Sequence, residues 1–379
     1  MSPEPREPLG PDGFTEPIRS VPYWPPADLM VHVLDRNPGG EKELTCCVTT
    51  PHLEEYCGSK TGEWLLPDAA DAVVTSQMEE FTMPGQEPGA RIKSLQGAGM
   101  EMFQSAPEVF KDAYWKMIDA DAPLQTILVA SEERSFPWEL MVPVRDDESL
   151  TEEDLMPLGV RFNMGRWYEN GMDKPNPAAF SDARVVAPRA EGKKPLSNAE
   201  NEKKLVLGSF GGESVQPCFV KEIDQQLKPW RGSLLHFVCH GETPTPMVQR
   251  LLLDKTEKLT LNRLRAMLGL KGAVHAARPV VFLNACEAGR ETISLVGAGG
   301  FAKQFVDAGA CAVIAPLWSV GDNEAFEVAT DFYSAVRAEP ETPFGEILRR
   351  IRTKAYEGDS KDTYAAYCLY GDPLLAAAG

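Results

Sequence analysis

A histidine and a cysteine each stand at the end of a short apolar run in this sequence. Residues 234–241 read LLHFVCHG, with His240 before the glycine, and residues 280–286 read VVFLNAC, with Cys286 last. A cysteine alone is mostly a thiol at neutral pH, and a nearby imidazole that takes its proton makes the nucleophilic thiolate accessible. These residue types therefore predict attack on a carbonyl carbon, with Cys286 as nucleophile and His240 as general base.

Two backbone N–H groups are expected to complete this chemistry. Gly241 follows the histidine, and because it has no Cβ a substrate carbonyl can approach its backbone. The N–H groups of Gly241 and Cys286 form the predicted oxyanion hole, in which each donor typically contributes ~2.7–4 kcal/mol.

Both apolar runs are predicted to be buried strands of one parallel sheet. From Ala183 onward, strand and helix patterns alternate, which is typical of an α/β fold. Ligands bind beyond the carboxyl ends of the strands in open parallel sheets. His240 and Cys286 stand at two such ends, so the sheet is expected to bring them to the same edge.

Each residue also has an ordinary structural explanation. A histidine at a strand end is often a hydrogen-bonded capping residue, and a buried cysteine is usually an inert small hydrophobe. A zinc site of His236, His240 and Cys286 is a further alternative, but no Cys-x-x-Cys or helical His-x-x-x-His pattern accompanies it. The glycines at 297, 299 and 300 lack the Lys-Ser or Lys-Thr of a phosphate loop. We therefore expect no metal and no cofactor.

Composition excludes several classes of partner. The formal net charge of the 379 residues is -18, which argues against nucleic acid and against an anionic membrane surface. The eight cysteines have no regular spacing, so reduced thiols and a cytoplasmic location are expected. The N-terminus has no apolar segment typical of a signal peptide. Charged residues interrupt the longest apolar region, so it is not expected to span a membrane.

The chain is predicted to have three parts. Residues 1–25 are proline-rich and are expected to be a flexible tail, residues 26–170 an N-terminal domain, and residues 180–379 the domain that carries the site. Within the second part, 28–50 is predicted to be a hairpin and 92–118 to be helical with a break at Pro107.

Four smaller expectations concern individual segments. Trp138 is expected to pack between the two halves, and Glu139 to accept hydrogen bonds from buried backbone N–H groups. Ser197 and Glu200 have the spacing of a capping box at the start of a helix. Residues 242–250 are predicted to be an exposed loop that gates the cleft.

Several segments together resemble one protein family. HFVCHG, NACEAG, RLLLD, FAKQFVDAGACAVIAPLWSVGD and YAAYCLYGDP, spread over residues 124–375, are similar to the CHAT domain family of caspase-like peptidases related to separase. The resemblance implies a caspase-like sandwich, with a mostly parallel sheet and helices on both faces. It also implies that the smaller N-terminal α/β domain is a pseudo-caspase-like or regulatory unit.

The resemblance also implies residue roles. His240 matches the family's general base and Cys286 its nucleophile, and because such sites generally use a dyad no third member is proposed. Asn284 matches a caspase position that lines the S1 pocket. Asp322 is similar to a separase residue that holds a basic P1 side chain, although its position equally suits capping of a helix that starts near Asn323.

The function implied is that of a caspase-like cysteine endopeptidase that cuts a protein partner. The family is common in bacterial defence and cell-death systems, where a gasdermin-like pore former or another co-encoded effector is cut, and a separate activator protein would switch the enzyme on. Two alternatives remain at this point. One is a catalytically inactive CHAT-fold adaptor, and the other is a cysteine-dependent hydrolase or acyltransferase that acts on small molecules.

Overall fold

The computed structural model describes most of the chain. The described residues are 27–35, 43–68, 70–82, 87–133, 136–145, 151–167, 180–245, 248–286, 300–318, 320–358 and 362–378. The predicted tail, residues 1–25, lies outside this part, and so does the side chain of Cys286.

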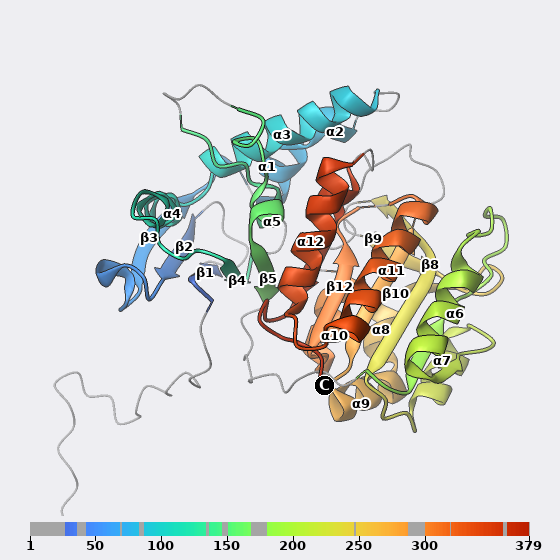
Figure 1. The fold of residues 1–379 in the computed structure, drawn as a ribbon. Helices are drawn as coiled ribbons and strands as arrows, with labels where there is room; N and C mark the ends of the chain where they lie inside the picture. Colours follow the sequence, from blue (N-terminus) through green and yellow to red (C-terminus); the bar gives the residue numbers. More distant parts are fainter. Residues whose placement is uncertain are drawn as a thin grey trace, which may run out of the picture.

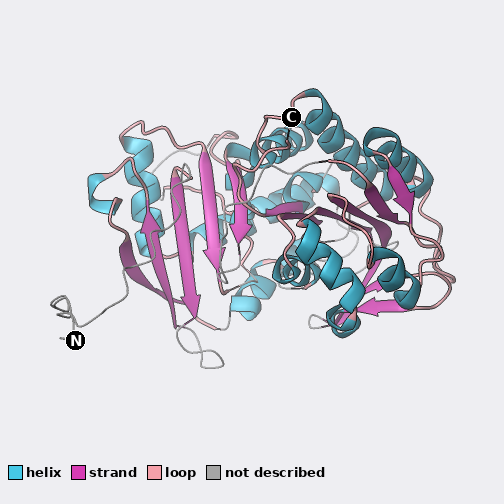
Figure 2. Cartoon of the chain, turned by 90° about the horizontal axis from the view of Figure 1, so that it is seen from below, coloured by secondary structure: helices cyan, strands magenta, loops and turns pink. Residues whose placement is uncertain are grey.

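One sheet of 13 strands runs through both halves of the described chain (Figures 1 and 2). Its order is β10-β9-β8-β11-β12-β13-β5-β4-β1-β2-β3, and β6 pairs with β8 and with β7. The strands are β1 (Leu29–Asp35), β2 (Glu43–Thr49), β3 (Lys60–Leu65), β4 (Thr126–Ser131), β5 (Asn163–Trp167), β6 (Ala183–Val186), β7 (Gly212–Ser214), β8 (Leu234–Thr245), β9 (Val248–Leu252), β10 (Lys258–Thr260), β11 (Val280–Cys286), β12 (Ala312–Pro316) and β13 (Tyr367–Tyr370).

The central strands are parallel, as the strand-helix alternation predicts. β6, β8, β11 and β12 run in the same direction, and β13 is antiparallel to β12. β12 is buried at every position, as expected of a strand covered on both faces. In the N-terminal half β5, β4 and β1 are parallel, and the predicted hairpin is confirmed as the antiparallel pair β1 and β2.

Helices cover both faces of this sheet, which confirms the expected α/β sandwich. α6, α11 and α12 pack side by side over one face, whereas α7, α8, α9 and α10 form the layer on the other (Figure 1). The longer helices are α1 (Ala70–Gln77), α3 (Pro88–Gln104), α4 (Glu108–Asp119), α6 (Ala199–Phe210), α7 (Val220–Leu227), α9 (Leu268–Ala277), α10 (Phe301–Ala308), α11 (Asp322–Ala338) and α12 (Phe344–Glu357). The shorter ones are α2 (Glu79–Thr82), α5 (Leu158–Arg161), α8 (Leu261–Ala266) and α13 (Thr363–Ala366). The predicted break at Pro107 is confirmed, because α3 ends before it and α4 starts after it.

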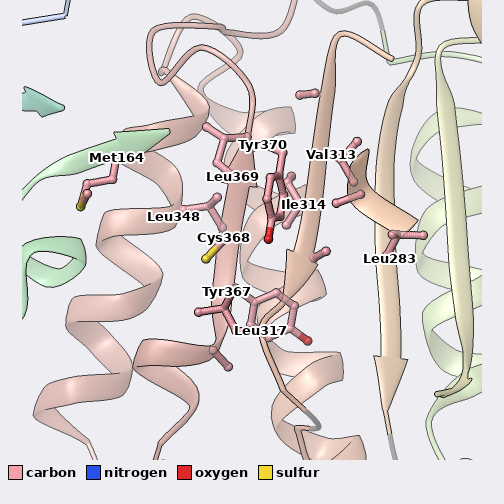
Figure 3. Close-up of a cluster of buried hydrophobic side chains, with 14 of the residues drawn as sticks. Met164, Leu283, Val313, Ile314, Leu317, Leu348, Tyr367, Cys368, Leu369 and Tyr370 are labelled. Atoms are coloured by element: carbon pink, nitrogen blue, oxygen red, sulfur yellow. The ribbon is translucent and has the colours of Figure 1, made fainter. Parts of the chain in front are cut away.

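The two halves of the sheet meet between β13 and β5. Tyr370 is the register partner of Arg166 there, and the two strands run parallel. Figure 3 shows the apolar side chains that close this junction, with Met164 from β5 facing Leu348 of α12 and Leu369 of β13. Gly165 is needed at this place, because a Cβ on it would lie 2.3 Å from the Gly371 carbonyl oxygen.

Two segment expectations prove wrong, and one is met only in part. Trp138 packs against the rings of Trp64, Phe110 and Phe136, all in the N-terminal half, so it does not fill the junction. Glu139 does accept a backbone hydrogen bond, but its main partner is the guanidinium of Arg166. Residues 242–250 are not a plain loop, because β8 continues past Gly241 and pairs antiparallel with β9. The alternation of apolar and polar residues in this hairpin is too short to be recognised in the sequence beside the apolar run that precedes it.

Candidate active site

The backbone of the sheet places the predicted nucleophile and base opposite each other. β8 and β11 are parallel neighbours, and Cys286 is the register partner of His240. The same register pairs Asn284 with Val238 two residues earlier. Cys286 ends β11, and His240 is the last residue of β8 that pairs with β11 before β8 continues beside β9. Both residues therefore stand at the carboxyl edge of the parallel part of the sheet, where ligands bind in folds of this class.

The imidazole of His240 is held by a backbone carbonyl. The side chain is 5% exposed, and Nε2 lies 2.9 Å from the carbonyl oxygen of Lys194. A carbonyl only accepts hydrogen bonds, so Nε2 carries the proton and Nδ1 is the basic nitrogen of the neutral ring. Every residue has a backbone carbonyl, so residue types give no sign of which carbonyl orients the ring. This orienting group therefore could not be predicted from the sequence.

An ion pair holds the segment that supplies this carbonyl. Glu242, two residues after the histidine, contacts Nζ of Lys193 at 3.2 Å and Nζ of Lys258 at 2.8 Å. Hydrogen bonding to Lys258 is the largest cause that holds the pKa of the Glu242 carboxyl below its ordinary value. Burial opposes it, and the hydrogen bond to Lys193 adds a further lowering. The pair therefore ties the residue before Lys194 to the strand that carries His240.

Gly241 is buried, but its described neighbours do not require a glycine. A Cβ at this position would lie 3.8 Å from Cβ of Ala285, which is ordinary van der Waals contact. The described residues thus do not account for the absence of a side chain at this position.

Five other cysteines are poor candidates for a nucleophile. Burial raises the pKa of each of these thiols, to about 12 for Cys218 and Cys311. The cysteines whose thiol pKa is raised by burial are Cys46, Cys218, Cys239, Cys311 and Cys368. A buried thiol with a raised pKa is inert, because the thiolate is the reactive species.

Asn284 makes hydrogen bonds to three other elements of the fold. It is buried, and its Nδ2 donates to Oε1 of Glu202 at 2.7 Å and to the Ala325 carbonyl at 3.0 Å. Its Oδ1 accepts from the hydroxyl of Tyr367 at 2.6 Å. Asn284 therefore links β11 to α6, α11 and β13 through hydrogen bonds, a role that the family resemblance does not imply.

Asp322 contacts the segment that precedes α6. Its carboxylate accepts hydrogen bonds from the hydroxyl of Ser197 and from the backbone N–H of Asn198, the latter at 3.1 Å. The capping alternative is wrong, because α11 already begins at Asp322 and Gly321 is its N-cap. The capping box at Ser197 is also wrong, since Asn198 is the N-cap of α6 and makes no side-chain cap.

A cavity of about 370 Å³ lies against His240. Its lining is mostly apolar and consists of Ala187, Pro188, Arg189, Ala190, Pro195, Leu196, Ala199, Glu200 and His240. A second hollow of about 600 Å³ adjoins it and shares Ala187, Arg189 and Glu200. Of the two hollows, the smaller one is the one that His240 lines.

His236 is unsuited to the zinc alternative. Its Nδ1 lies 2.7 Å from the hydroxyl of Tyr333 and its Nε2 lies 2.7 Å from Oε1 of Glu202, so both ring nitrogens have protein partners. Within the described residues, no group of three His, Cys, Asp or Glu side chains could hold a metal ion.

In the same part of the chain, none of the helices is long and apolar enough to cross a membrane.

Comparisons with known proteins find similar solved structures and one matching family. The solved structure titled "Structure of Protease" is similar at 11% identity and a TM-score of 0.44, covering 81% of this chain and 77% of that one. A Saccharomyces cerevisiae separase-securin complex at 3.0 Å is similar at 10% identity and a TM-score of 0.48, covering 91% of this chain but only 30% of that one. No sequence among the curated proteins matches. The CHAT domain model matches residues 113–372, more than half of the chain and part of both halves of the sheet, so this protein belongs to the CHAT domain family.

Proposed function

We propose that this protein is a cysteine endopeptidase that cleaves a protein partner through Cys286 and His240. The caspase-like fold of the family supports the reaction class. One observation carries the assignment to these residues: Cys286 and His240 are register partners, and they are the last pair in the parallel register of β11 and β8. The hydrogen bond from His240 Nε2 to the Lys194 carbonyl adds to it, because it leaves Nδ1 as the nitrogen that can accept a proton.

In the proposed mechanism, Nδ1 of His240 takes the proton of the Cys286 thiol. The thiolate attacks the scissile carbonyl carbon, and the backbone N–H groups of Gly241 and Cys286 stabilise the oxyanion. The C–N bond then breaks as His240 gives the proton to the leaving amine. Water hydrolyses the thioester and regenerates the thiol. The surroundings of Gly241 support this role. Its described neighbours do not require a glycine, and the missing Cβ gives a substrate carbonyl room to approach the backbone N–H.

A broad peptide-library digest tests the proposal. The wild-type chain is expected to cleave peptides, whereas Cys286→Ala and His240→Ala are expected to be inactive with unchanged circular dichroism. Cys239→Ala is the matched control, because Cys239 is a buried thiol on the same strand as His240. Full activity in Cys286→Ala or His240→Ala would reject the dyad.

An inactive adaptor is the second candidate. A peptide carrying a thiol-reactive warhead separates the two, since it labels Cys286 rapidly only if the thiol is activated. Labelling no faster than that of a free cysteine would favour the adaptor.

The cellular setting is proposed from the state of the cysteines and from the family resemblance. Cys46, Cys47, Cys57, Cys218, Cys239, Cys311 and Cys368 are free thiols, which agrees with a reducing compartment such as the cytoplasm. A role in bacterial defence, with a gasdermin-like or other co-encoded substrate and a separate activator, rests on the family resemblance. Co-expression with a candidate substrate and inspection for a Cys286-dependent cut is the corresponding test.

A further inference from the structure

A cluster of buried polar side chains lies beneath the proposed dyad. We call it the strand-end network and define it as Glu202, His236, Asn284, Tyr333 and Tyr367, all of them buried. Polar side chains in a protein interior cost free energy unless they are hydrogen-bonded to one another. A cluster of this size next to a reactive edge therefore needs an explanation.

One carboxylate oxygen joins the two strands that carry the dyad. Oε1 of Glu202 lies 2.7 Å from Nε2 of His236 on β8 and 2.7 Å from Nδ2 of Asn284 on β11. Glu202 itself belongs to α6 and is 2% exposed. A single side chain thus bridges β8 and β11 from the helix that covers them.

The tyrosines complete the hydrogen bonding of this bridge. The hydroxyl of Tyr333 on α11 meets Nδ1 of His236 at 2.7 Å, and that of Tyr367 on β13 donates to Oδ1 of Asn284 at 2.6 Å. The second N–H of Asn284 goes to the Ala325 carbonyl. Burial raises the pKa of Tyr333 well above its ordinary value, so this hydroxyl remains a donor. Each donor in the bridge has an acceptor, which locks the orientation of both side chains.

The bridge lies close to the dyad along both strands. Asn284 stands two residues before Cys286 and His236 four residues before His240, or roughly 7 Å and 13 Å at about 3.3 Å per residue. Glu202 also sits in the first turns of α6, shortly after the segment whose Lys194 carbonyl holds His240. One side chain is therefore linked to the strand of the nucleophile, to the strand of the base, and to the helix that follows the orienting carbonyl.

We propose that Glu202 is a positioning residue that keeps Cys286 and His240 in register by bridging β8 and β11. This inference rests on the proposed function. The essential feature is an oxygen acceptor at the place of Oε1, where it receives two N–H groups at once. Because a misplacement of 1 Å in a catalytic group costs about 100-fold in rate, loss of the bridge is expected to lower kcat by about that factor.

Three substitutions of Glu202 separate the bridge from simple packing. Glu202→Gln keeps an oxygen that can accept both N–H groups, so it is expected to retain kcat within a few-fold. Glu202→Asp keeps the charge but is one methylene too short, and Glu202→Ala removes the acceptor. Both are expected to lower kcat about 100-fold with little change in KM. Val206→Ala is the matched control, because Val206 is fully buried one turn further along α6 and makes none of these contacts. It is expected to lower the melting temperature without lowering kcat.

The rate of Cys286 alkylation by iodoacetamide, measured by peptide mass against pH, gives a readout that does not need cleavage. The midpoint is expected to move to higher pH in Glu202→Ala and Glu202→Asp and to stay near wild type in Glu202→Gln and Val206→Ala. If wild type cleaves nothing, the proposed function fails, while this profile still tests the bridge. The bridge is overturned if folded Glu202→Ala keeps wild-type kcat and midpoint, or if Glu202→Gln loses as much as Glu202→Ala.

Discussion

Removing the carboxylate of Glu139 is expected to destabilise this protein strongly. Nε of Arg166 lies 2.8 Å from each oxygen of this carboxylate, and Nη2 of the same guanidinium also contacts it. The two side chains are 1% and 8% exposed. Burial alone would raise the pKa of Glu139, but the Arg166 guanidinium holds this pKa below its ordinary value.

The magnitude follows from what Glu139→Ala would leave behind. Breaking a buried ion pair by removing one partner typically costs about 3–5 kcal/mol, because the remaining charge is buried and uncompensated. A second buried guanidinium, that of Arg352, lies in the same region and donates to the Tyr367 carbonyl at 2.7 Å. Two like charges would then share a site without a counter-ion, so we expect the upper part of that range.

Urea unfolding followed by circular dichroism measures this effect. Glu139→Ala is expected to lower the midpoint sharply, whereas the double variant Glu139→Leu, Arg166→Met is expected to recover most of the stability, since an apolar pair of similar volume is often neutral. Glu55→Ala is the control, because its contacts with Lys60 and Lys116 are exposed and its midpoint should not move. A cost for Glu139→Ala below about 1 kcal/mol, the value typical of surface pairs, would refute the reasoning.

Two further predictions concern the surroundings of the dyad. Because the Glu242 pKa is lowered, its ion pairs stabilise the fold above the ordinary carboxyl pKa near 4.5 and lose that effect as pH falls through the lower folded value. Glu242→Gln is expected to lower kcat at neutral pH, where the wild-type carboxylate holds both lysines, by less than the about 100-fold cost of a 1 Å misplacement. It is also expected to flatten the acid limb of stability, and an unchanged limb would contradict this. If the Asp322 carboxylate serves to hold Asn198, Asp322→Asn should leave the ratio of Arg to Leu cleavage at P1 unchanged. A selective loss of Arg cleavage would instead assign it to the S1 pocket.

The sequence predicted the end of β11 and the position of both residues, because these depend on local pattern. β11 ends at Cys286 as expected, and the parallel register makes His240 its partner. The expected strand end at His240 is wrong, because β8 continues to Thr245 and pairs with β9 there. The helix break at Pro107 was readable for the same local reason. These features need only the side chains of a few consecutive residues.

What could not be predicted depends on contacts between distant segments. The orienting group of His240 is a main-chain oxygen, and the partner of Glu139 is an arginine 27 residues away. Asn284 resembled a pocket residue, yet its position below Glu202 follows only from the way α6 lies on the sheet. The division of the chain near residues 170–180 stays a prediction, while the sheet and the family match both extend across it.

The junction between β5 and β13 has a consequence for any shortened form of this protein. A fragment starting at residue 180 would lack β5, and one side of β13 would present unpaired N–H and C=O groups beside a row of apolar side chains. Such an edge is a template for another chain. The smaller half thus shields its larger neighbour from self-association, whatever else it does.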